Sequence, residues 1–154
     1  MQKIFILFVL VLGGIAQAAR AKSFQDSLEG KWQGFCSPVA IAGTSKMCSY
    51  TFFKNGKGAY TCDYYKDLRC GEKEAKTTNM TFSYNLSQPT DKTAKVTLDY
   101  SSLDDDVKQE KHRFFITGNV LRVQTYEVVR LPSSKPENLE AQGVVPFFEY
   151  TRAK

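Results

Sequence analysis

The sequence predicts an all-β protein, an eight-stranded antiparallel up-and-down β-barrel with two disulfides. Three observations lead to this fold class. Apolar and polar residues alternate with a period of two along most of the chain, which is typical of strands with one buried face. Turn residues separate these segments at short intervals, as in β-barrels and sandwiches. Four cysteines lie between positions 36 and 70, and an even number of cysteines is typical of an exported domain.

A segment typical of a secretory signal peptide precedes the strands. Residues 4–15 are an unbroken apolar run after a short polar start, and Ala16-Gln17-Ala18 is a small-x-small cleavage site. The run is too short to span a bilayer comfortably. We therefore interpret residues 1–18 as a cleaved signal peptide and residues 19–154 as a single barrel domain, with a second candidate cleavage point at residues 19–21. No cysteine lies near the cleavage point, which argues against a lipoprotein.

The predicted strands follow in order along the mature chain. The first covers residues 30–36, and the second and third cover residues 48–53 and 58–65. Between the latter two, Asn55-Gly56 favours the positive φ angles of a tight hairpin turn. Alternation is clearest in residues 78–86 and 93–100, the fourth and fifth strands. Residues 111–117, 120–129 and 145–152 complete the set, with a turn at Gly118-Asn119 and a polar connection at 132–143 that has room for one helical turn around 136–141.

Charge and length exclude several classes of protein. The whole chain has 21 Lys and Arg residues against 16 Asp and Glu, a net charge of +5. Without the signal peptide, 136 residues and a charge of +4 remain, because Lys3 is lost. A short mature chain that follows a signal peptide excludes a membrane-spanning protein and a cytosolic enzyme. The basic residues form no runs, so we expect no nucleic acid partner, and we expect a monomer.

The cysteines are expected to form two disulfides rather than a metal site, since the chain has no C-x-x-C and one histidine. In a three-strand meander all four thiols gather at one end of the barrel. The hairpin register that pairs Tyr50 with Tyr60 places Cys48 opposite Cys62. This favours Cys48–Cys62 with Cys36–Cys70. The alternative, Cys36–Cys48 with Cys62–Cys70, stays open.

The start of the domain resembles the opening of the lipocalins. In that family a short helical lead-in, here residues 24–29, precedes a Gly-x-Trp, here Gly30 and Trp32. The resemblance implies that Trp32 closes the bottom of the barrel and that Arg152, on the last strand, stacks on it. The chain is most similar to small bacterial lipocalin-like (calycin-type) secreted domains, in which one cysteine closes the first strand and another follows a Tyr-rich strand. The Thr-Asp-Tyr motif of the lipocalins has only a faint echo at residues 97–100.

Residue patterns for catalysis are nearly absent. His112 is the one available imidazole, and its phase places it inside the barrel with Phe114. The chain has no G-x-S-x-G, no H-E-x-x-H and no phosphate-binding glycine loop. Residues 104–106, three consecutive aspartates, are interpreted as a solvated loop rather than a Ca²⁺ site, because no ligand spacing surrounds them. We expect no enzyme activity, no metal and no cofactor.

Residues predicted to face the barrel interior are mostly aromatic. The candidate ligand-lining residues are Tyr50, Phe52, Tyr60, Phe82, Tyr84, Tyr100, His112 and Phe114. An eight-stranded barrel is either filled by side chains or holds one small ligand. Large aromatic rings favour filling, whereas several tyrosine hydroxyls favour a pocket with convergent polar groups. Both interpretations stay open.

We therefore expect an exported binding protein that holds a small hydrophobic or amphipathic ligand in the barrel, secreted or periplasmic, without catalysis. The alternative is a protein–protein interaction module of the envelope or exterior, such as a hydrolase inhibitor. It would use the loops at 36–48, 63–70 or 132–143, because rigid loops lose little entropy on binding a partner.

Overall fold

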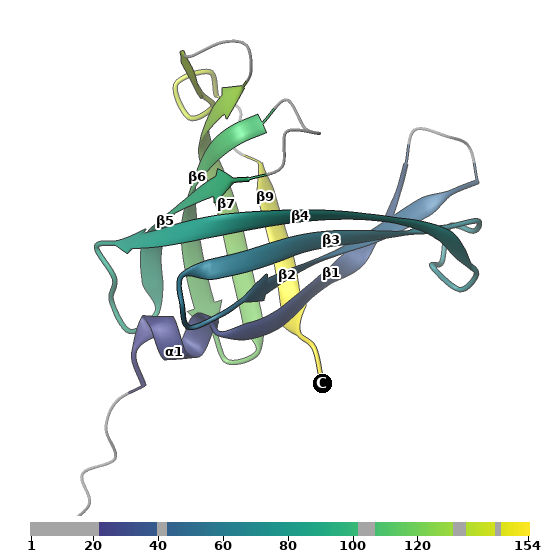
Figure 1. Ribbon diagram of the computed structural model, residues 1–154, viewed down its shortest axis with the longest axis horizontal. Helices are drawn as coiled ribbons and strands as arrows, with labels where there is room; N and C mark the ends of the chain where they lie inside the picture. Colours follow the sequence, from purple (N-terminus) through teal and green to yellow (C-terminus); the bar gives the residue numbers. More distant parts are fainter. Residues whose placement is uncertain (1–21, 40–42, 102–106, 131–134, 144–145) are drawn as a thin grey trace, which may run out of the picture.

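A computed structural model of the chain is a closed antiparallel β-barrel of eight strands, which confirms the predicted fold class (Figure 1). It describes residues 22–39, 43–101, 107–130, 135–143 and 146–154. The elements are α1 (Phe24–Leu28), β1 (Gly30–Pro38), β2 (Ser45–Phe52), β3 (Lys57–Tyr65), β4 (Lys73–Ser87), β5 (Thr93–Tyr100), β6 (Val107–Thr117), β7 (Val120–Arg130), β8 (Pro136–Asn138) and β9 (Phe147–Arg152). Each of β1 to β7 pairs with the next strand, and β9 closes the barrel between β7 and β1.

Several strands begin earlier than the alternation predicts. The largest difference is in β4, which starts at Lys73 rather than at residue 78. Its first five residues are exposed or half-buried on both faces, so no alternation marks them. The helical turn expected around 136–141 is wrong at its start, because Pro136–Asn138 forms β8, which pairs with β7 outside the barrel. The predicted signal peptide and residues 104–106 lie outside the described residues.

The hairpin between β2 and β3 forms where the sequence predicts it, with a different turn. Gly56 has a φ of +75°, whereas Asn55 is not among the residues with positive φ. The backbone N–H of Phe53 donates to the carbonyl of Lys57 at 2.9 Å. One left-handed residue therefore suffices in this loop, and glycine supplies it. The shorter turn between β6 and β7 likewise places Gly118 at a φ of +58°.

Two disulfides join the first four strands at one end. Cys48 pairs with Cys62 across the β2–β3 ladder, where the two residues are directly opposite. Cys36 at the end of β1 pairs with Cys70 in the loop before β4. The predicted nested connectivity is confirmed. The alternative with Cys36–Cys48 is wrong because Cys36 lies opposite Met47, so that the side chains of Cys36 and Cys48 point to opposite faces of the sheet. Such bridges suggest an oxidising environment outside the cytoplasm.

The helix α1 lies at the opposite end of the barrel (Figure 1), and buried side chains close this end. Ser23 caps the helix, and Phe24 and Leu28 are buried. Trp32 is fully buried and donates its indole N–H to the carbonyl of Leu28 at 2.7 Å. The guanidinium of Arg152 lies 4.2 Å from the centre of the Trp32 ring and donates to the carbonyl of Glu29 at 2.6 Å. This is the arrangement that the resemblance implies.

Gly30 gives the chain the freedom to enter β1 from this helix. Its φ is +108°, and an added Cβ would lie 3.0 Å from the Arg152 guanidinium. Both facts favour glycine here.

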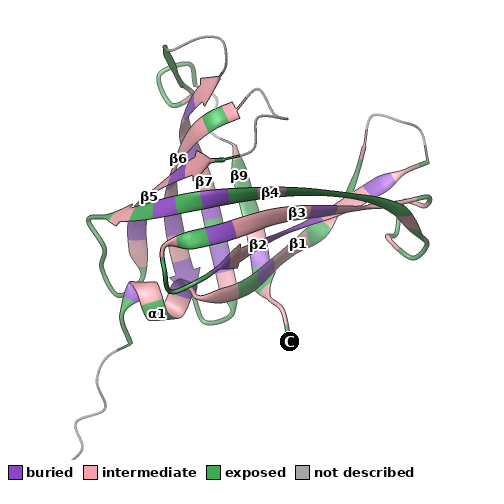
Figure 2. Ribbon diagram, in the orientation of Figure 1, coloured by how far each residue is buried: buried purple, intermediate pink, exposed green. Residues whose placement is uncertain are grey.

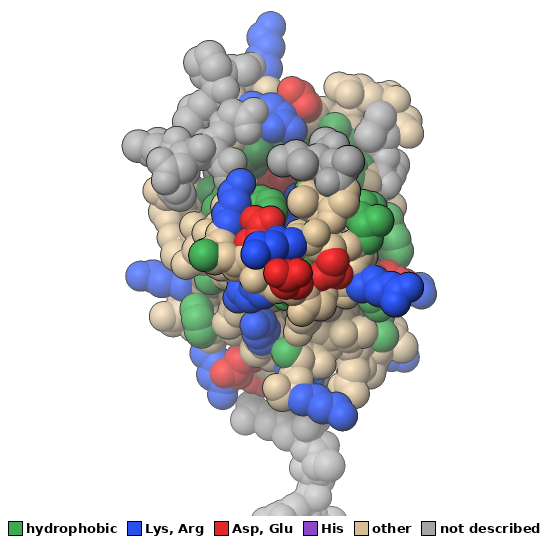
Figure 3. Space-filling model, turned by 90° about the vertical axis from the view of Figure 1, so that its right-hand side faces the viewer, with side chains coloured by type: hydrophobic (Ala, Val, Ile, Leu, Met, Phe, Trp, Pro, Cys, Tyr) green, Lys and Arg blue, Asp and Glu red, His purple; other side chains and the backbone are tan. Residues whose placement is uncertain are grey.

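Buried residues gather where the two groups of strands cross, while the outer part of β1–β4 extends beyond the barrel with little buried surface (Figure 2). We call this extension, together with its connecting loop at residues 66–72, the arm. Its tip carries intermixed acidic and basic side chains (Figure 3), including the ion pair between Lys73 and Asp63 at 2.8 Å. Among the described residues, no helix is long and apolar enough to cross a membrane.

Candidate functional site

A cavity of about 710 Å³ occupies the half of the barrel away from α1. All eight barrel strands contribute to its wall. The lining residues are Gly34, Phe35, Ser37, Lys46, Cys48, Tyr50, Tyr60, Met80, Tyr100, Val107, Glu110, Thr125, Phe147, Phe148, Glu149 and Tyr150. Ligand sites for small molecules typically have volumes of about 300–1,000 Å³ and a mainly apolar wall with a few polar groups. The cavity meets both conditions.

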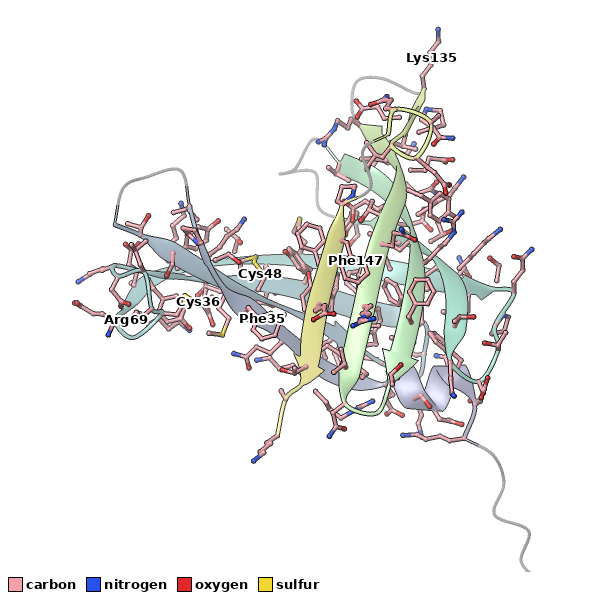
Figure 4. The ribbon with its side chains drawn as sticks, turned by 180° about the vertical axis from the view of Figure 1, so that it is seen from behind. Phe35, Cys36, Cys48, Arg69, Lys135 and Phe147 are labelled. Carbon is pink, nitrogen blue, oxygen red and sulfur yellow. A yellow bond between two sulfur atoms is a disulfide. The ribbon has the colours of Figure 1, made fainter. Side chains whose placement is uncertain are left out.

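The cavity opens between β1 and β9. Among the described residues, these two strands pair at three positions only, from Trp32–Arg152 to Gly34–Tyr150. Beyond Gly34, β1 has an irregular register against β2 and turns into the arm. The strands therefore separate where β9 begins, and Phe35 and Phe147 lie at the two sides of the opening (Figure 4).

This opening explains an exposed aromatic residue on the inner face. Phe148 shares the inward phase of Tyr150, yet it is 52% exposed, whereas Tyr150 is 6% exposed. The difference follows from the position of Phe148 above the last β1–β9 pair, where no strand covers it. Phe35 and Phe147 are also about half exposed or more. The mouth thus has an apolar rim.

The structure divides the predicted lining residues into two groups. Tyr50, Tyr60 and Tyr100 line the cavity. The other five are buried inside the barrel but lie outside the lining of this cavity: Phe52, Phe82, Tyr84, His112 and Phe114. Three of these pack around Phe52, whose ring centre lies 5.3–5.7 Å from those of Phe82, Tyr84 and Phe114. The barrel is therefore filled by side chains near α1 and contains a cavity at the other end. The sequence left a filled interior and a pocket open as alternatives, and the structure has one of them in each half.

A polar network forms the wall of the cavity on β5, β6 and β7. Tyr100 donates its hydroxyl hydrogen to Glu110 Oε2 at 2.7 Å. His112 Nε2 lies 3.1 Å from the same oxygen, and His112 Nδ1 lies 2.9 Å from the hydroxyl of Thr125. His112 is 1% exposed, whereas the side chain of Glu110 keeps 22% of its surface exposed. The carboxylate thus faces the cavity, and the imidazole supports it from behind.

Glu110 is ionised in this environment. Burial alone raises the pKa of its carboxyl group, but hydrogen bonds from His112 and Tyr100 and the positive charges nearby lower it by more, so that the pKa lies below its usual value. The cavity therefore holds a carboxylate at neutral pH.

Four tyrosines line the same cavity as this carboxylate and remain neutral. The ring of Tyr50 lies 4.6 Å from that of Tyr60 and 5.1 Å from that of Tyr150, centre to centre. Burial raises the pKa of Tyr50, Tyr100 and Tyr150 well above the usual value, and that of Tyr60 less strongly. The negative charge of Glu110 raises all four further. Their hydroxyls consequently stay protonated and can donate or accept hydrogen bonds.

The sequence reasoning missed Glu110, Tyr150 and Thr125 as lining residues. Glu110 has the same strand phase as His112 and Phe114, so its position inside the barrel could be read from the alternation. The prediction used aromatic character to choose lining residues and so left out Glu110. Among the described residues, no three His, Cys, Asp or Glu side chains are placed to hold a metal ion.

The fold and the cavity are consistent with the calycin-like class, small antiparallel β-barrels closed at one end and open at the other. Comparison with family models found no match, and neither did the comparisons with curated proteins and with solved structures.

Proposed function

We propose that the protein is an exported lipocalin-like binding protein that holds a small amphipathic molecule in its cavity. The observation that carries the proposal is the cavity of about 710 Å³, which combines an apolar mouth with a buried carboxylate and four tyrosines. An apolar body of the ligand would contact Phe35, Phe148 and Met80, and its polar group would reach the hydroxyls. The predicted signal peptide and the two disulfides support an exported location.

The proposed function includes no catalytic step. All four cysteines are joined in disulfides, so that none offers a thiolate. His112, the imidazole that acid–base chemistry would require, has both ring nitrogens occupied by Glu110 and Thr125 and is 1% exposed. Its contacts are those of a residue that positions a carboxylate.

The proposal is tested with the uncharged fluorophore prodan, whose emission shifts to the blue in apolar surroundings. We expect saturable binding to the disulfide-bonded protein with a stoichiometry of one. Met80→Trp places a larger side chain on the cavity wall and should reduce the affinity at least tenfold. The matched control is Asn79→Trp, because Asn79 is the neighbouring residue of β4 and is exposed on the outer face. Absence of saturable binding, or equal loss in both variants, contradicts the proposal.

A second candidate function is a protein-binding module that uses the tip of the arm. The carboxylate of Asp67 accepts hydrogen bonds from the backbone N–H groups of Arg69, Gly71 and Glu72. The Cys36–Cys70 disulfide fixes the same loop, and Leu68 at its tip is 60% exposed. A rigid loop with an exposed apolar side chain is suited to contact a partner protein with little loss of entropy.

Native mass spectrometry of the protein from its own host separates the two candidates. A co-purifying small molecule supports the cavity function. A stoichiometric protein partner that is lost in Leu68→Asp supports the arm function instead.

A further inference from the structure

The charge inside the cavity indicates the chemistry of the ligand, and this inference rests on the proposed cavity function. Of the residues in the described lining, Glu110, Glu149 and Lys46 are charged. Glu149 is neutralised by Arg122, whose Nε lies 2.7 Å from its carboxylate. Glu110 and Lys46 are thus the two charges that a ligand can meet without displacing this ion pair.

Glu110 and Lys46 lie in different parts of the cavity. Lys46 is four residues from Tyr50 along β2, about 13 Å at about 3.3 Å per residue. It pairs across the sheet with Ser37 of β1 and Tyr64 of β3, in the arm beyond the last β1–β9 pair. Lys46 therefore lies on the arm side of the cavity, whereas Glu110 lies in the polar wall on β5, β6 and β7.

The hydrogen bonds around His112 hold the Glu110 carboxylate in place. In the tautomer with its proton on Nε2, His112 donates to Glu110 at 3.1 Å and accepts from the Thr125 hydroxyl at 2.9 Å. This tautomer satisfies the hydrogen-bonding groups of all three residues. Tyr100, the other partner of the carboxylate, donates its hydroxyl hydrogen to the same oxygen. The network consequently orients the carboxylate toward the cavity.

The tyrosine rings add a second attraction for positive charge. Tyr50, Tyr60 and Tyr150 form a continuous aromatic wall with ring centres 4.6 Å and 5.1 Å apart. Aromatic faces carry a negative partial charge and attract cations within about 6 Å, more strongly where water is excluded. A carboxylate beside aromatic faces is the combination that recognises an ammonium ion, and the same carboxylate repels a ligand acid in a cavity of low dielectric constant.

We propose that the ligand of the cavity is an organic amine, an aryl- or alkylammonium ion whose charged nitrogen binds between Glu110 and the tyrosine wall and whose apolar body extends toward Phe148 at the mouth. Fatty acids and other amphipathic anions are excluded from this position by the same carboxylate. The apolar body can reach the mouth because the β1–β9 pairing ends at Gly34 and Tyr150.

The test compares three ligands with the same naphthyl body by isothermal titration calorimetry. These are 2-(1-naphthyl)ethylamine, 2-(1-naphthyl)ethanol and 3-(1-naphthyl)propionate. We expect the amine to bind at least tenfold more tightly than the alcohol and at least a hundredfold more tightly than the acid. This comparison uses the unmodified protein, so it does not depend on how a variant folds.

A matched pair of variants locates the charge. Glu110→Gln should weaken amine binding at least tenfold and change alcohol binding less than threefold. Glu127→Gln removes the same charge from the outer face of the neighbouring strand, where Glu127 pairs with Lys111 at 2.5 Å, and should leave amine binding within threefold of the original value.

The outcomes separate this inference from the proposed function. If prodan binds but the alcohol or the acid binds as tightly as the amine, or if Glu110→Gln has no effect on the amine, the amine inference is overturned and the cavity function stands. If neither prodan nor any of the three ligands binds, both are overturned.

Discussion

Replacing Arg152 with methionine should destabilise the protein by about 3–5 kcal/mol through the closed end of the barrel. The guanidinium donates to the backbone carbonyls of Ser27 and Glu29 and lies 4.2 Å from the centre of the Trp32 ring. It thus joins the end of the last strand to the C-terminal residues of α1. Methionine keeps an unbranched side chain of similar length and removes only the charge and the donors.

The magnitude follows from these contacts. A hydrogen bond from a charged donor contributes about 1.5–3 kcal/mol, and a cation–π contact about 0.5–2 kcal/mol. Arg152 is only half-buried, and water can replace part of its hydrogen bonds to the two carbonyls. The two hydrogen bonds and the ring contact combine to about 3.5–8 kcal/mol, and the partial exposure of Arg152 reduces the expected loss to about 3–5 kcal/mol. Arg152→Lys should lie between methionine and arginine, because an ammonium keeps the charge but cannot reach both carbonyls with the planar geometry of a guanidinium.

Urea denaturation followed by far-ultraviolet circular dichroism measures the free energy of unfolding of the three proteins. A double-mutant cycle with Trp32→Phe isolates the contact between the guanidinium and the ring. If Arg152→Met unfolds within 1 kcal/mol of the original protein, or if Arg152→Lys is no better than Arg152→Met, then the closed end does not depend on this guanidinium and the reasoning is refuted.

Three further predictions concern packing, covalent links and pH. Gly58→Ala should abolish or severely weaken folding, measured by thermal denaturation, because the new Cβ would lie 2.4 Å from the Phe82 ring; a variant as stable as the original would contradict this packing. Replacing both Cys48 and Cys62 with alanine should lower the free energy of unfolding by about 3 kcal/mol, since their sequence separation is 14 residues; an unchanged urea midpoint would show that the loop is already ordered in the unfolded chain. The lowered pKa of Glu110 means that its ionisation stabilises the fold above the unfolded pKa of about 4.3 and that this contribution is lost as pH falls through the folded pKa. Urea titrations from pH 7 to pH 3 should therefore show a steeper acid loss for the original protein than for Glu110→Gln, and parallel curves would contradict the assigned ionisation.

The arrangement of the interior shows how far local patterns reach. Alternation placed Phe52, Tyr50 and Tyr100 on the inner face correctly, because the side chains of a strand point to opposite faces in turn. The same alternation places Glu110 on the inner face, because Glu110 is two residues before His112 on β6. Alternation does not predict how far along the barrel axis an inward-facing residue lies. Phe52 lies in the filled half and Tyr50, two residues away, lines the cavity.

The strand boundaries show the same limit. The first residues of β4 are polar on both faces, since they lie in the arm where neither face covers a core. Their strand conformation depends on pairing with β3, and that pairing is not visible in the residues of β4 alone. The helical turn expected around residues 136–141 was wrong at its start for a similar reason, because Pro136–Asn138 is a strand only through its pairing with β7.

By itself the sequence determined the number of barrel strands, their antiparallel order, the Cys48–Cys62 register and the inward set of aromatic residues. Those features follow from side-chain alternation and turn residues, which act between neighbours along one strand or across one hairpin. Only the tertiary structure decided where the barrel is filled, where β1 leaves β9 and which side chains meet Glu110. These depend on distances between strands that are far apart in the chain, and the closing pair of strands, β1 and β9, lies more than a hundred residues apart.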